Sequence, residues 1–67
     1  MNSLTYMTLV FLGVRIAELT AEAQFLREYT LNKEFQLKAT IIEKKIDFLE
    51  FMQKEKELEL EDERRGN

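Results

Sequence analysis

The chain has 67 residues and a net charge of −3, and it contains no Cys, His or Pro. A chain of this length forms one domain, and its core seldom contributes more than about 5 kcal/mol of stability without a disulfide, a metal or a partner. The missing Cys excludes disulfides, and the missing Cys and His remove the usual ligands of a structural metal. We therefore expect the chain to associate with itself.

Composition also excludes several classes of function. Without His or Cys the chain lacks the commonest proton shuttles and nucleophiles, and it has no Gly-rich phosphate loop, so we expect no enzyme, no cofactor and no metal site. Lysines are interleaved with glutamates rather than gathered into a basic face, which disfavours nucleic acid as a partner. The absence of Cys favours a cytoplasmic location. The Pro-free, 34% charged composition is typical of an all-α protein with long helices.

The first expected element is a helix over residues 4–29 that is apolar on two opposite sides. On one side the apolar residues alternate steps of three and four, the heptad rule for a seam between packed helices. We call this set the heptad stripe: Leu9, Leu12, Ile16, Leu19, Ala23 and Leu26. About half a turn away, at about 100° per residue, lies the second stripe. It consists of Met7, Val10, Phe11, Val14, Ala17, Ala21 and Phe25. Both sides of such a helix should be covered.

Small residues and charges add detail to this helix. Gly13, Ala17 and Ala21 stand four residues apart and form a ridge that another backbone could approach closely. Gly13 destabilises an exposed helix by about 1 kcal/mol relative to Ala. Close packing at this position would explain its presence; the alternative is that Gly13 is simply tolerated or marks a kink. We predict that the heptad stripe and this ridge form the interface between copies of the chain. Arg15 and Glu18 lie between the two stripes, where an ion pair would help to fix the register.

The apolar run over residues 4–14 raises the question of a membrane. Arg15 ends this run, which is shorter than the about 20 residues that cross a bilayer. A secretory signal would carry positively charged side chains before the apolar run, and the residues before this run carry none. We do not expect the membrane as a partner, and peripheral attachment to one is the weakest of our functional alternatives.

The heptad phase fails after Leu26, and an apolar seam in a different phase begins at Phe35. This change predicts a turn over about residues 30–33 and a second helix over about 33–60, capped by Thr30 or Asn32. No Gly or Pro marks the junction, so one continuous helix of about 85 Å remains the alternative. We prefer the hairpin because its two arms are similar in length. Two hairpins would pair into a four-helix bundle or a coiled-coil-like homodimer.

The second helix should also carry more than one apolar set. Its seam consists of Phe35, Ala39, Ile42, Ile46 and Leu49. Aromatic residues and Met, which are enriched where proteins bind one another, define a candidate partner-binding patch. We call it the aromatic patch: Tyr29, Phe48, Phe51 and Met52. The alternative is that these residues pack in the core of the bundle. Residues 61–67 are expected to be a frayed or disordered charged tail, so that residues 1–60 form the single helical domain.

These patterns favour a small non-enzymatic protein-binding module: a regulator, adaptor or inhibitor that acts as a homo-oligomer, most simply a dimer. Its apolar helix faces would hold the copies together, and the aromatic patch would bind another protein. The alternative is a structural or assembly element whose self-association is itself the function.

Overall fold

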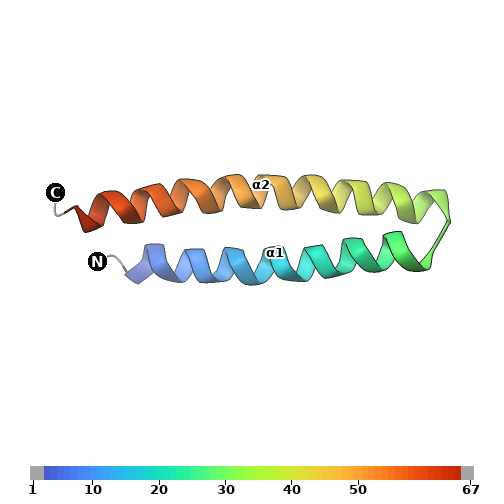
Figure 1. Cartoon of the computed structure of the whole chain (residues 1–67), viewed down its shortest axis with the longest axis horizontal. Coiled ribbons are helices and arrows are strands. Elements are labelled where there is room, and N and C mark those ends of the chain that lie inside the picture. The colour runs from blue at the N-terminus through green and yellow to red at the C-terminus, as the bar shows by residue number, and fades with distance from the viewer. Residues whose placement is uncertain (1–2, 66–67) are drawn as a thin grey trace.

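In the computed structural model, which describes residues 3–65, the chain is a helical hairpin of α1 (Ser3–Tyr29) and α2 (Lys33–Arg64). The two helices run antiparallel and side by side, so that the start of α1 and the end of α2 lie at the same end of the molecule (Figure 1). The Cα atoms occupy an envelope of 52 × 14 × 13 Å. The predicted hairpin is confirmed, and the continuous-helix alternative is wrong.

Side-chain hydrogen bonds, rather than Gly or Pro, build the turn. Asn32 has an extended backbone, and its side-chain oxygen accepts a hydrogen bond of 2.8 Å from the backbone N–H of Glu34, which caps α2. The Gln36 side chain donates to the backbone carbonyls of Leu26, at 3.3 Å, and Thr30, at 2.6 Å. Carbonyls at a helix end have no partner within the helix. Polar side chains of α2 supply that partner, so the chain can reverse here without Gly.

A single seam of apolar side chains holds the two helices together. At its centre are Leu19, Ala23 and Ile42, which are buried, with three half-buried neighbours: Leu26, Ile46 and Leu49. Ala39 of α2, a small residue of the same seam, has no exposed surface. The heptad stripe thus faces the apolar seam that the sequence predicts for the second helix, and the two meet within one chain.

The helices stay paired from the turn to the open end. Arg27 forms an ion pair with Glu43 near the turn, and a Cβ atom added to Gly13 would lie 3.8 Å from Nε2 of Gln53 midway along. At the open end, the hydroxyl of buried Thr5 donates a hydrogen bond of 3.4 Å to Glu63. Both helices are therefore in contact over nearly their whole length.

Helix α2 continues beyond its predicted end near residue 60. It runs through Arg64, and the backbone N–H of Arg65 donates to the carbonyls of Glu61 and Asp62 at 3.3 and 3.2 Å. Leu60 is buried and Glu63 accepts a hydrogen bond from Thr5, so the last turns of α2 pack on α1. Residues 66 and 67 of the predicted tail lie outside the described residues.

Candidate interaction surfaces

The second stripe of α1 lies on the side away from α2 and is left uncovered. Its five large side chains expose between 51 and 67% of their surface: Met7, Val10, Phe11, Val14 and Phe25. Ala17 and Ala21, which lie among them, are exposed as well. The hairpin therefore uses one of the two apolar sides of α1 and leaves the other to solvent.

Near the start of α1 this exposed stripe is hollowed. An apolar depression of about 500 Å³ is lined by Tyr6, Met7, Val10, Phe11 and Val14. Residues 7, 10, 11 and 14 have the spacing of the four residues that surround a hole in knobs-into-holes packing. The depression is therefore shaped to receive an apolar side chain from another helix.

The residues predicted for self-association divide between two environments. The heptad stripe packs on α2: Leu12, Leu19 and Ala23 are buried, and Leu9, Ile16 and Leu26 are half-buried. Gly13 is half-buried, and the nearest atom to an added Cβ would be in van der Waals contact rather than in a clash. Only Ala17 and Ala21 of the ridge are exposed, so close approach by a second backbone is open to them. A role for the heptad stripe between copies stays a prediction.

A charged edge borders the second stripe. Arg15, Glu18 and Glu22 are all exposed on this edge. Within residues 3–65 the ion pairs join Arg27 to Glu43, Lys56 to Glu59 and Arg65 to Glu61. The expected Arg15–Glu18 pair is not among them. The charges beside the exposed apolar stripe are therefore available to a partner.

The structure separates the members of the aromatic patch. Tyr29 ends α1 beside the turn and is 73% exposed, with its ring centroid 5.1 Å from that of Phe25. Phe48 and Phe51 lie midway along α2 and are each 62% exposed, next to half-buried Met52. Tyr29 therefore extends the second stripe of α1, while the other three residues make a separate apolar surface on α2.

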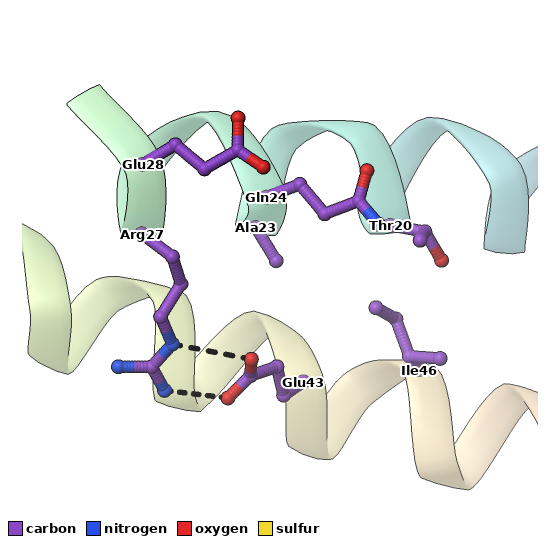
Figure 2. A pocket seen from close by; sticks show the side chains of 7 residues that line it. All are labelled: Thr20, Ala23, Gln24, Arg27, Glu28, Glu43 and Ile46. Carbon is purple, nitrogen blue, oxygen red and sulfur yellow. Dashed lines mark hydrogen bonds and ion pairs between the residues drawn. The ribbon is translucent and has the colours of Figure 1, made fainter.

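A polar cluster beside the turn joins the two helices, and we call it the turn clamp: Arg27, Gln36, Thr40 and Glu43. The Arg27 guanidinium donates to both carboxylate oxygens of Glu43, at 3.2 and 2.6 Å, as Figure 2 shows. It also donates to the side chains of Gln36, at 2.8 Å, and Thr40, at 2.9 Å. The hydrogen bonds between Arg27 and Glu43 hold the pKa of Glu43 below, and the pKa of Arg27 above, its ordinary value.

A small cavity of about 250 Å³ adjoins the turn clamp, where Ala23 of α1 and Ile46 of α2 point toward each other (Figure 2). The Arg27 and Glu43 side chains remain 39 and 47% exposed, and their hydrogen bonds are made to each other and to neighbouring side chains. The clamp is thus a structural device. Sequence reasoning missed it, although a basic residue in the last turn of α1 precedes polar residues at 36, 40 and 43 on one face of α2. In the part of the chain that the structure describes, no group of His, Cys, Asp or Glu could hold a metal ion.

By length and composition, α1 could also cross a membrane. Within Leu4–Tyr29 a window reaches a mean hydropathy of 1.4, and 17% of that window is buried in the hairpin. The prediction from the sequence considered only the run that ends at Arg15, whereas the longer window includes the small and apolar residues that follow. A signal sequence near an N-terminus, or the core helix of a soluble protein, has the same composition.

No protein-family model, curated protein or solved structure matches this chain.

Proposed function

We propose that the protein is a small non-enzymatic binding module that associates with itself through the uncovered apolar side of α1 and binds another protein through α2. The observation that supports this proposal is that 15 large hydrophobic side chains among residues 3–65 are exposed on the hairpin. Monomeric soluble proteins rarely expose contiguous apolar patches of more than a few hundred Å² without an interaction to make there.

The exposed area agrees with pairing. The chain exposes 5449 Å², whereas a compact monomer of its mass, 8.0 kDa, exposes about 4,450 Å². The excess of roughly 1,000 Å² arises because a two-helix rod has no second layer of helices packed on it. It is similar to the area of about 800 Å² that each partner buries in a stable interface. Laying two rods side by side would remove this excess, and the result is a four-helix bundle.

The α2 surface supports the binding of a further protein. Phe48 and Phe51 are exposed beside Met52, and aromatic residues and Met are enriched in the centres of protein interfaces. This surface belongs to a different helix from the second stripe. A hairpin could therefore pair through α1 and still offer α2 to a partner.

Affinity capture with the intact chain tests this division of roles. We expect wild type and Phe51→Asp to have the same helicity by circular dichroism and the same mass by light scattering. Only wild type should retain the partner. Loss of the oligomer in Phe51→Asp, or capture that is equal for both proteins, would overturn the assignment of α2. An oligomer that grows without limit as concentration rises would instead support the assembly element.

A second candidate is membrane attachment, which the hydropathy of α1 favours. The hairpin and a spanning α1 exclude each other, because more than half of the residues in α2 are charged and would be drawn into the bilayer beside α1. Flotation with phosphatidylcholine–phosphatidylglycerol vesicles separates the two candidates. A self-associating hairpin stays with the soluble fraction, whereas a membrane protein floats.

A further inference from the structure

We propose that the occupant of the second stripe is the second stripe of another copy, with the two α1 helices antiparallel and a two-fold axis at the level of residue 16. This inference rests on the proposed self-association and specifies its geometry. The interface would be isologous, so that each copy gives the same surface and receives the same surface.

The distribution of bulk along the stripe favours the antiparallel direction. Its first half carries Met7, Val10, Phe11 and Val14, whereas its second half carries Ala17 and Ala21 before the stripe ends at Phe25. With the axis at residue 16, Phe11 of one copy lies at the level of Ala21 of the other, and Val14 lies close to the level of Ala17. The two large side chains nearest the axis then each meet an alanine, and Met7 meets Phe25 at each end of the interface.

A parallel pair would lack this match. Phe11 would meet Phe11 and Ala21 would meet Ala21, which crowds the interface at residue 11 and leaves a gap at residue 21. Gaps and crowding each cost stability, because helix interfaces pack at the density of protein interiors.

The depression at the start of α1 takes part in the same arrangement. The hole bounded by residues 7, 10, 11 and 14 is centred at the level of residue 21 of the other copy. Ala21 would enter this hole, and its missing bulk would let the aromatic ring of Phe11 lie against the facing backbone. Phe25 closes the far end opposite Met7.

Charge complementarity supports a second copy over a lipid surface. A two-fold axis perpendicular to the helices places the Arg15, Glu18 and Glu22 edges of both copies on the same side. Arg15 of one copy then lies about 1.5 Å along the axis from the level of Glu18 of the other. The pair that does not form within the chain could form between chains. Bare lipid chains would offer these exposed charges no partner.

Two spin-label distances test the geometry, since the chain has no Cys of its own and accepts single labels. Tyr6→Cys and Gln24→Cys place labels on the exposed flank of α1. In the antiparallel dimer the two copies of each label lie about 30 Å and about 24 Å apart along the helix axis, respectively. A shift of the axis lengthens one distance and shortens the other, so the pair of values locates the axis. A parallel dimer gives about 10 Å at both positions and would overturn the inference.

A matched pair of variants tests which surface is used. Phe11 and Phe51 are 67 and 62% exposed in the hairpin, so replacing either with Asp should leave helicity unchanged. We expect Phe11→Asp to weaken dimerisation at least tenfold and Phe51→Asp to leave it intact. A dimer that survives Phe11→Asp contradicts the inference but leaves self-association standing. A wild-type monomer that floats with vesicles contradicts both.

Discussion

The two sides of α1 have nearly equal apolar content and opposite environments. The heptad stripe packs on α2, with Leu12 and Leu19 each only 4% exposed, while Phe11 and Val14 of the second stripe are more than half exposed. Both sides have a helical repeat, so the repeat alone does not say which partner each side meets. The difference shows that a two-helix chain can cover one side of a doubly apolar helix by folding, while the other side stays exposed.

The largest expected effect comes from truncating a leucine side chain in the buried seam, compared with the same truncation on the exposed surface. Leu19→Ala deletes buried atoms at the centre of the interhelix seam and should destabilise the hairpin by about 2–5 kcal/mol. Leu37→Ala makes the same chemical change at a position that is 62% exposed, where the cost should be within about 0.5 kcal/mol. Urea unfolding followed by circular dichroism measures both. Equal costs would mean that the buried seam and the exposed surface of the hairpin do not differ as described.

A smaller effect is expected at Gly13, which lies at the border between the two environments. An added Cβ would meet only Nε2 of Gln53 at 3.8 Å, so the hairpin has room for it. Gly13→Ala should therefore stabilise the protein by up to about 1 kcal/mol, because Ala has the higher helix propensity. Thermal unfolding across a dilution series provides the measurement. Destabilisation that appears only at high concentration would show that a second backbone approaches Gly13 after all.

The smallest effect is expected from the exposed turn clamp and depends on pH. Since hydrogen bonds from Arg27 lower the pKa of Glu43 in the folded state, the pair stabilises the fold above the unfolded pKa. This contribution disappears as pH falls through the lowered folded value. Glu43→Gln should melt slightly below wild type at about pH 7 and together with it at about pH 2. A difference that is the same at both pH values would mean that the ion pair is not its source.

Much of the fold could be predicted from local pattern. The loss of heptad phase after Leu26 predicted the position of the turn, since a continuous helix that packs on one other helix keeps its apolar residues in one heptad phase. Asn32 could be named as a possible cap because its side chain favours that position. The turn clamp could not be predicted, because Arg27 meets Gln36 and Glu43 only after the chain has reversed.

The surfaces were harder to predict than the turn. The heptad stripe was identified as a helix interface, but periodicity cannot distinguish a partner within the chain from a partner outside it. The sequence prediction placed Leu60 at the last residue of the helical domain, where the expected charged tail begins. Its burial depends on the length of α1, whose start reaches the last turns of α2.

Sedimentation of the wild-type chain across a dilution series tests most directly whether the exposed side of α1 is covered by a second copy. We expect a single closed species of twice the 8.0 kDa chain mass at about 10–100 μM, with dissociation into helical monomers on dilution. A folded, soluble monomer over the whole concentration range would contradict that self-association.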